Sequence, residues 1–289
     1  MLCQLNNVSK RFLLPSASLF AARNTVRAVD RIDLDIAHRE TLSLVGESGS
    51  GKTTLGRIIA DLYRPDQGTV FYKGEDIRKM SRRKYGNFRR SVQVVFQDPF
   101  SSLDPRFNVQ ALLKEAFTLQ RTINKQQQRH LMGEMLKAVG LSDDVIMRYP
   151  HEFSGGERQR LAIARTLLSD PKLVILDEAV SSLDVLVQKQ ILDLLNDLKT
   201  RFDLTYVFIS HNLRVVTQIS DRIAVMFNGK IVEIGPARDV VTRPQHPYTK
   251  ELLGAAMEYK TPPGKRDWVM SYESLGQMVS PGHWVMNIS

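Results

Sequence analysis

Short apolar segments alternate with segments of helical periodicity along most of the chain. Residues 41–45 and 173–176 are short and mainly apolar, which is typical of strands buried on both faces. Residues 29–36 alternate apolar and polar positions, as a strand with one buried face does. Residues 54–62 and 187–198 repeat apolar positions at helical spacing instead. This alternation of strands and helices predicts an α/β fold.

Two other regions depart from this pattern. Residues 2–12 form a strand-like opening, residues 13–28 are loop-like and basic, and residues 69–72 resume strand character. The N-terminal third is therefore predicted to contain an antiparallel β subdomain. Residues 108–140 keep apolar positions at helical spacing, which predicts an inserted α-helical subdomain at about residues 98–165.

The sequence from residue 46 to residue 53 fits the phosphate-loop pattern G-x-x-x-x-G-K-[ST] at every fixed position. It lies between a predicted strand and a predicted helix, so backbone N–H groups and the helix N-terminus can surround an anion. Lys52 would reach the β- and γ-phosphates of a nucleoside triphosphate, and the Thr53 hydroxyl would bind Mg²⁺. An ordinary glycine-rich turn is the alternative, and the correct flanks argue against it. The predicted nucleotide-binding residues here are Gly46, Glu47, Ser48, Gly49, Ser50, Gly51, Lys52, Thr53 and Thr54.

Two carboxylates follow the predicted strand at residues 173–176. Asp177 and Glu178 would lie at the C-terminal end of that strand, where open α/β sheets bind their ligands. Asp177 would hold the Mg²⁺ shell, and Glu178 would polarise the attacking water as general base. His211 stands just past a later core strand, at the same edge of the sheet, in a position to contact the γ-phosphate. The alternatives are a pair of surface acids capping a turn and a structural histidine.

Two further signals have two interpretations each. Ser154 followed by Gly155 and Gly156 predicts a helix start whose N–H groups can hold an anion. Taken alone, the same pattern fits a flexible loop that leads into a helix equally well. Phe12 is either a plain core residue or an aromatic that offers its ring face to an adenine base.

Composition narrows the class of protein. At 289 residues the chain is long enough for one large domain with a subdomain, or for two small domains. No apolar stretch is long enough to cross a bilayer and the N-terminus lacks a secretory-signal pattern, so we expect a cytoplasmic protein. The single cysteine, Cys3, excludes an internal disulfide and a cysteine-based zinc site.

The formal net charge of +9 has its densest basic part at residues 78–90. Such a run is most often a solvated face, and a surface near lipid headgroups is the second interpretation. Nucleic acid comes third, because the run lacks the repeated aromatic platforms of single-strand binders and the chain has no helix-turn-helix or zinc-finger pattern. We therefore expect no nucleic-acid partner.

Six motifs occur along the chain in this order: the phosphate loop, Gln97, Ser154-Gly155-Gly156-Glu157, Asp177-Glu178, Ser182-Leu183-Asp184 and His211. In this order they resemble the motifs of the ATP-binding subunit of an ABC transporter. The resemblance covers about residues 2–254, and the joint occurrence of the motifs is far more specific than any one of them. It implies an ABC-type P-loop ATPase domain at residues 1–254 and a C-terminal tail at residues 255–289.

The resemblance also implies roles for individual residues. Phe12 matches the aromatic that stacks on adenine, and Gln97 matches the residue that contacts the metal and the attacking water. Residues 154–156, with Glu157 beside them, match the signature that binds the γ-phosphate of an ATP held on a second subunit. Asp184 matches the loop that crosses between the two subunits. The implied assembly is a head-to-tail dimer that buries two ATP molecules.

Narrower features resemble the oligopeptide and dipeptide importer branch, a bacterial group that also serves nickel, glutathione and related solutes. Three departures stand beside them: Glu157 replaces a common glutamine, Ala179 replaces a frequent proline, and residues 258–289 contain no cysteine. The tail therefore cannot hold the iron–sulfur ligand set that the tails of many relatives resemble. The features that carry the branch resemblance are residues 97–106, His246-Pro247-Tyr248-Thr249 and the insertion at residues 13–28.

The predicted function is an ATP-hydrolysing subunit that powers the import of a solute, with di- or oligopeptides as the solute class. Its partners would be a second ATP-binding subunit, two transmembrane permease subunits and, indirectly, an extracytoplasmic solute-binding protein. The subunit would lie peripherally at the cytoplasmic face of a bacterial inner membrane.

Two rival functions remain. A soluble ABC ATPase acting on ribosomes or nucleic acid usually has two cassettes or a long coiled coil, and this sequence shows neither. A regulatory module that binds ATP without hydrolysing it would not need Lys52, Asp177, Glu178 and His211 together, and this chain has all four.

Overall fold

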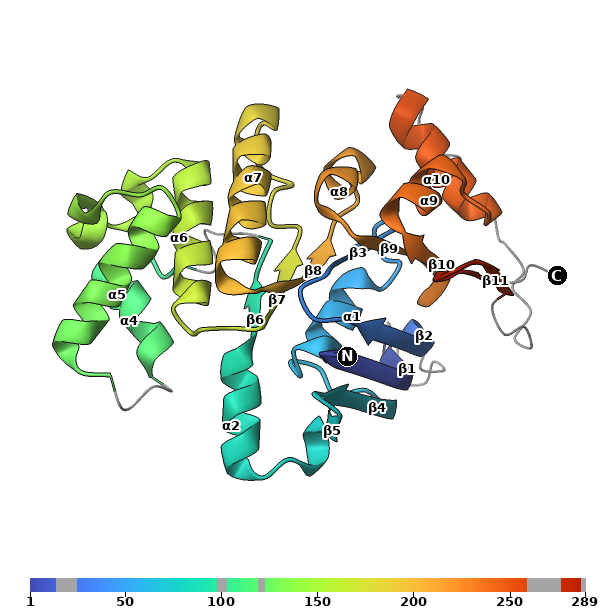
Figure 1. The fold of residues 1–289 in the computed structure, drawn as a ribbon, viewed down its shortest axis with the longest axis horizontal. Coiled ribbons are helices and arrows are strands. Elements are labelled where there is room, and N and C mark those ends of the chain that lie inside the picture. The colour runs from blue at the N-terminus through green and yellow to red at the C-terminus, as the bar shows by residue number, and fades with distance from the viewer. Residues whose placement is uncertain (14–24, 98–102, 119–122, 259–276, 287–289) are drawn as a thin grey trace, which may run out of the picture. The chain divides into compact units, whose positions relative to one another are not determined.

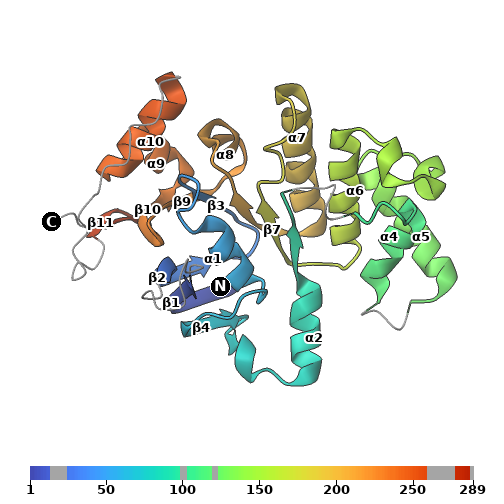
Figure 2. The same cartoon turned by 180° about the vertical axis from the view of Figure 1, so that it is seen from behind.

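The computed structural model describes residues 1–13, 25–97, 103–118, 123–258 and 277–286. The chain divides into two compact units. The first unit combines Met1–Ile77 with Phe208–Ser289, and the second is Arg78–Val207. Figures 1 and 2 show the elements of each unit from opposite sides.

An antiparallel sheet opens the first unit and agrees with the predicted N-terminal β subdomain. β1 (Cys3–Leu13) pairs with both β2 (Thr25–Ile36) and β4 (Gln67–Tyr72), and the short β5 (Glu75–Asp76) pairs with β4. Alternate residues of β2 are buried from Ile32 onward, as the sequence pattern of that strand predicts.

The second sheet of this unit is centred on β3 (Thr41–Val45), which is buried along its whole length. The strand order is β11-β12-β10-β9-β3. β3 and β9 are parallel, whereas β9 with β10, β10 with β12 and β12 with β11 are antiparallel. Ser210, which follows β8 (Thr205–Ile209), donates its N–H to the Leu44 carbonyl at 3.2 Å. The other elements of the sheet are β9 (Arg222–Phe227), β10 (Lys230–Pro236), β11 (Gln277–Ser280) and β12 (His283–Val285). The helices of the unit are α1 (Lys52–Ile59), α8 (Leu213–Ile219), α9 (Ala237–Thr242) and α10 (Pro247–Glu258).

The second unit contains the parallel strands β6 (Val92–Val95) and β7 (Leu173–Asp177). β7 is fully buried, as its apolar sequence predicts. A group of helices, α4 to α6, packs together in both views (Figures 1 and 2). The helices are α2 (Arg82–Ser91), α4 (Val109–Lys114), α5 (Lys125–Ala138), α6 (Gly155–Leu167) and α7 (Val185–Phe202). Short 3₁₀ turns lie at Ile77–Lys79, Glu115–Phe117, Asp143–Met147 and Pro150–Glu152.

One prediction about the N-terminal sheet is wrong at its boundary. Residues 25–28 were predicted as part of a basic loop, but they continue β2 because they pair with the end of β1. The pairing partners are Arg11 with Arg27 and Phe12 with Val26. Residues 14–24 of the predicted insertion, residues 98–102 and tail residues 259–276 lie outside the described residues.

The basic run at residues 78–90 includes the exposed helix α2. Arg82, Arg83 and Lys84 are exposed, and Phe88 turns inward and is buried. This arrangement agrees with the interpretation of the run as a solvated face. Among the described residues, no helix is long and apolar enough to cross a membrane.

Cys3 provides a test of the N-terminal sheet, because its side chain is buried in β1 and burial raises the pKa of the thiol to about 12. The thiolate is the reactive form. We therefore expect dithionitrobenzoate at mildly alkaline pH to label the native protein about 100-fold or more slowly than the protein unfolded in guanidinium chloride. Rapid labelling of one thiol without denaturant would contradict this packing.

Candidate functional site

The predicted phosphate loop joins β3 to α1 and passes unusually close to neighbouring backbone. Gly46, Gly49 and Gly51 have φ angles of 146°, 83° and 106°. A Cβ on Gly46 would lie 2.2 Å from the Met226 carbonyl oxygen, and a Cβ on Gly51 would lie 2.1 Å from that of Ala28. Neither distance is possible for a real side chain, so the loop requires glycine at both positions.

The turn between β9 and β10 closes on the same loop. Gly229 in this turn donates its N–H to the Ser50 carbonyl at 3.0 Å and accepts from the Asp30 N–H at 2.8 Å. A Cβ on Gly229 would lie 2.8 Å from the Arg27 carbonyl oxygen. The phosphate loop is therefore held between β2 and the β9–β10 turn.

Lys52 lies inside this loop and is buried. Its Nζ donates to the carbonyl oxygens of Gly46 and Glu47, at 2.8 and 2.7 Å, and to Ser50 Oγ at 3.3 Å. α1 begins at Lys52, and Gly51 at its N-cap contributes no side-chain hydrogen bond. An ammonium group and the start of a helix thus meet at one point, which is the arrangement that binds phosphate.

Phe12 and His211 belong to the same unit as the loop. Phe12 is partly exposed near the end of β1, with the Tyr63 ring edge-on at 5.5 Å between centroids and Lys10 Nζ 5.6 Å from its ring centre. His211 is exposed and directly follows Ser210, whose N–H binds the β3 carbonyl of Leu44. The partial exposure of Phe12 agrees better with an accessible ring than with a core residue.

In the second unit the structure brings two predicted catalytic residues together. Gln97, after β6, donates from Nε2 to Glu178 Oε2 at 3.0 Å. Glu178 follows the buried Asp177 at the end of β7 and has a φ of 49°, in the left-handed region that is costly for a residue with a side chain. Ser181 holds this turn by donating its N–H and its hydroxyl to the Glu178 carbonyl, at 3.1 and 2.9 Å.

The predicted signature opens α6, with Ser154 as its N-cap. Ser154 Oγ accepts from the Glu157 N–H at 3.4 Å, and Glu157 Oε2 accepts from the Ser154 N–H at 2.8 Å and from its hydroxyl at 2.7 Å. These two bonds from Ser154 lower the pKa of the Glu157 carboxyl. The carboxylate of Glu157 therefore turns back onto its own helix start.

The signature also packs against the start of α7. A Cβ on Gly156 would lie 2.7 Å from Val187 Cγ1, and a Cβ on Gly155 would lie 3.5 Å from Leu183 Cδ2. Asp184 caps α7 by accepting from the Val187 N–H at 3.0 Å. The small residues of the signature thus let two helix starts approach each other.

The predicted site residues fall into two groups by unit. The sequence did not indicate that Tyr248 contacts the phosphate loop, although it lies in a segment that resembles one importer branch. Its hydroxyl accepts from the Glu47 N–H of the phosphate loop at 3.0 Å. The first unit holds Phe12, Gly46–Thr54 and His211, and the second holds Gln97, Ser154–Glu157, Asp177, Glu178 and Asp184.

Comparison with known proteins gives concordant matches. Residues 29–181 match the sequence profile of the family described as ABC transporter. The oligopeptide transport ATP-binding protein OppF of Bacillus subtilis (strain 168) is 42% identical over 99% of this chain and 95% of its own length. The glutathione import ATP-binding protein GsiA of Escherichia coli (strain K12) is 45% identical over 87% of this chain, which spans only 40% of that relative.

Solved structures agree with the predicted ABC-type fold. A dimeric bacterial ABC transporter cassette is similar with a TM-score of 0.69 and 26% identity, over 82% of this chain and 99% of that one. The protein cbiO1 from Clostridium perfringens, part of an ABC transporter complex, is similar with a TM-score of 0.71 and 23% identity, over 84% and 91% of the two chains. These similarities confirm an ABC ATPase core with an antiparallel N-terminal sheet.

The close approach at Gly51 can be tested by adding one methyl group. Gly51→Ala places a Cβ against the Ala28 carbonyl, so we expect a loss of about 3 kcal/mol of unfolding free energy and no stabilisation by ATP. Gly74→Ala is the matched control, because Gly74 also has a positive φ but nothing within 4 Å of the added atom. That variant should lose only about 1 kcal/mol. Equal losses in thermal unfolding would refute the role of the close approach.

Proposed function

The chain belongs to the ABC transporter family, and from this premise we propose that it is the ATP-hydrolysing subunit of an importer for di- or oligopeptides. The similarity to the oligopeptide transport protein over 99% of the chain supports the solute class. Import of glutathione or another small solute is the second candidate, supported by relatives at 45% identity. The observation that carries hydrolysis is the contact between Gln97 and Glu178.

The phosphate loop would bind the triphosphate of ATP. Lys52 would exchange the carbonyl oxygens of Gly46 and Glu47 for the β- and γ-phosphate oxygens, which carry more charge. The N–H groups at the start of α1 would add further donors, because the first turn of a helix has no carbonyl partners of its own. Phe12 would stack on the adenine.

Glu178 would take a proton from the attacking water. Its left-handed backbone costs about 1–3 kcal/mol, and the bonds from Ser181 hold it there. The Gln97 amide would orient the Glu178 carboxylate through its bond to Oε2. His211 would donate to the γ-phosphate as negative charge builds on it.

The donor atoms of this chain suit Mg²⁺. Thr53 offers a hydroxyl, Asp177 a buried carboxylate at a strand end and Gln97 an amide oxygen, since its Nε2 already donates to Glu178. Mg²⁺ prefers oxygen ligands and usually takes only a few of them from the protein. When bound, the ion would neutralise charge that develops on the β- and γ-phosphates.

A second ATP-binding subunit would cover the surface formed by the signature residues 154–157 and the start of α7. Val185 and Leu186, which directly follow Asp184, are 83% and 69% exposed. They stand beside the start of α6, because Gly156 packs on Val187 of the same helix. Large apolar side chains so exposed are typical of an interface. The head-to-tail dimer would place Ser154, Gly155 and Gly156 against the γ-phosphate bound to the other subunit.

The membrane partners would be two permease subunits, with a solute-binding protein acting through them. In this mechanism, closure of the dimer would move Gln97, and that movement would be transmitted to the permease subunits. The subunit would act at the cytoplasmic face of the membrane, where ATP is available.

Replacing Glu178 by glutamine tests the general base. Glu178→Gln keeps the size of the side chain but removes the proton acceptor, so ATP hydrolysis by the assembled complex should fall about 100-fold or more while ATP binding persists. Glu134→Gln, at an exposed position of α5, is the matched control and should keep the parent rate. Hydrolysis by Glu178→Gln at the parent rate would remove Glu178 from this role.

We expect Glu157 to weaken the binding of ATP by the signature residues 154–156. The Ser154 hydroxyl donates to the Glu157 carboxylate and so is not available to a phosphate, and the carboxylate itself repels one. Glu157→Gln should therefore lower KM for ATP severalfold, while weakening the helix start by about 0.5–1 kcal/mol. The depressed pKa of Glu157 means that its stabilisation is present above the usual glutamate pKa and is lost only as pH falls through the lowered value.

The matched control for this prediction is Glu152→Gln. Glu152 caps a nearby 3₁₀ turn in the same way, accepting from the Tyr149 N–H at 2.6 Å, but it lies outside the signature. Its replacement should leave KM for ATP unchanged. If Glu157→Gln and Glu152→Gln both lowered KM for ATP, or if neither did, the carboxylate of the signature would have no specific effect on ATP binding.

A further inference from the structure

The C-terminal hairpin β11–β12 is docked on β10 of the first unit, on the side away from β9. Within β12, Val285 pairs with Glu233 and Trp284 pairs with Ile234, and the Met286 N–H donates to the Val232 carbonyl at 2.9 Å. β11 pairs with β12 on its outer side. The described part of the tail therefore docks on its own chain.

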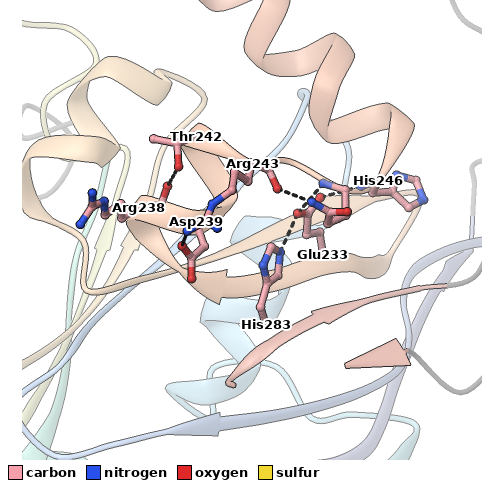
Figure 3. A network of polar contacts seen from close by, with 8 residues as sticks. Glu233, Arg238, Asp239, Thr242, Arg243, His246 and His283 are labelled. Atoms are coloured by element: carbon pink, nitrogen blue, oxygen red, sulfur yellow. Dashed lines mark hydrogen bonds and ion pairs between the residues drawn. The ribbon is translucent and has the colours of Figure 1, made fainter. Parts of the chain in front are cut away.

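Gly235 makes room for the docking. A Cβ on Gly235 would lie 2.8 Å from Cδ2 of the His283 ring and 3.2 Å from its Cα. His283 is consequently buried against β10 (Figure 3). The neighbouring Trp284 points the other way and is 43% exposed.

The buried carboxyl of Glu233 joins three segments (Figure 3). It is 1% exposed, and it accepts from His283 Nε2 at 2.8 Å and from the N–H groups of Gln245 and His246 at 3.0 and 2.9 Å. A buried carboxyl needs such donors, since burial without them costs several kcal/mol. Glu233 thus ties the hairpin to the chain just before α10.

From there, hydrogen bonds lead to the phosphate loop. His246 Nδ1 accepts from the Tyr248 N–H at 3.1 Å, and burial lowers the pKa of His246, which favours an unprotonated acceptor. Tyr248 is buried, with its ring 4.4 Å from that of Phe227 between centroids. Its hydroxyl accepts from the Glu47 N–H at 3.0 Å.

The Glu47 residue is therefore held from two sides. Tyr248 binds its N–H, and Lys52 binds its carbonyl oxygen. When Lys52 turns to a phosphate it gives up that carbonyl, and Tyr248 keeps the loop in place. A side chain 201 residues away in sequence would then decide how well the loop is ordered for its ligand.

We propose that Tyr248 is a positioning residue for the phosphate loop and that the C-terminal hairpin, acting through His283, Glu233 and His246, keeps Tyr248 in place. The tail would thus set the affinity of the subunit for nucleotide. This inference rests on the proposed function, because it assumes that the loop binds ATP.

Tyr248→Phe tests the inference by removing only the hydroxyl. In the assembled complex, KM for ATP should rise about fivefold with kcat within about twofold, because the loop loses an anchor and no reacting group is removed. Tyr206→Phe is the matched control, since Tyr206 is also a buried tyrosine and donates its hydroxyl to the Leu195 carbonyl in the second unit. It should leave KM unchanged even if thermal stability falls. If KM for Tyr248→Phe equalled the parent value, the hydroxyl would have a packing role only.

Gly235→Ala tests the part played by the hairpin. It should displace His283 and raise KM in the same direction, and combining it with Tyr248→Phe should raise KM less than the product of the two single effects, because both act on one path. Trp284→Ala, on the exposed side of the hairpin, should change nothing. Independent effects of Gly235→Ala and Tyr248→Phe would overturn the coupling.

Direct binding of a fluorescent ATP derivative separates the possible failures. A parent protein that binds no nucleotide would overturn the proposed function. A parent protein that binds it, with Tyr248→Phe and Gly235→Ala binding equally well, would leave the proposed function standing and overturn this inference alone.

Discussion

The phosphate loop depends on close backbone contacts that only glycine permits. Main-chain atoms of β2 and of the end of β9 approach the loop so closely that Cβ atoms at Gly51 and Gly46 would overlap carbonyl oxygens. A Cβ at Gly229, in the β9–β10 turn, would likewise overlap a carbonyl oxygen of β2. Such contacts help to fix the peptide groups of the loop, and the Lys52 ammonium adds bonds to the carbonyl oxygens of Gly46 and Glu47. Preorganisation of this kind lowers the cost of binding, because the loop need not be ordered by the nucleotide.

Two glutamates of the second unit, Glu178 and Glu157, have carboxylates in different hydrogen-bonding environments. Glu178 sits on a strained turn, and its Oε2 accepts a hydrogen bond from the Gln97 amide. Glu157 instead accepts both the N–H and the hydroxyl of Ser154, which stabilises the start of α6 and occupies the hydroxyl of the signature serine. In the proposed mechanism the first arrangement serves hydrolysis at a cost in stability, whereas the second stabilises a helix start.

Local features of the fold and site could be predicted because nearby residues determine them. The serine cap of α6, the buried strand before Asp177 and the glycine positions of the phosphate loop each depend on a few adjacent residues. The orientation of Glu157 was also readable, since Ser154-x-x-Glu157 is a capping box. The comparison with the family noted Glu157 only as a replacement for a common glutamine. The extension of β2 to Thr25 depended on pairing with β1, which no local pattern contains.

The path from the tail to the phosphate loop could not be predicted, because it depends on an irregularity in one strand. The register of β10 against β9 shifts between Ile231 and Glu233, so that Val232 and Glu233 are both buried although they are adjacent in sequence. A regular strand would alternate its faces and would direct a glutamate beside a buried valine to solvent. The bulge turns Glu233 inward, where only hydrogen-bond donors make its burial tolerable. His283 and the N–H groups of the chain before α10 supply these donors. The buried carboxyl of Glu233 thereby connects the C-terminal hairpin to the segment that contacts the phosphate loop.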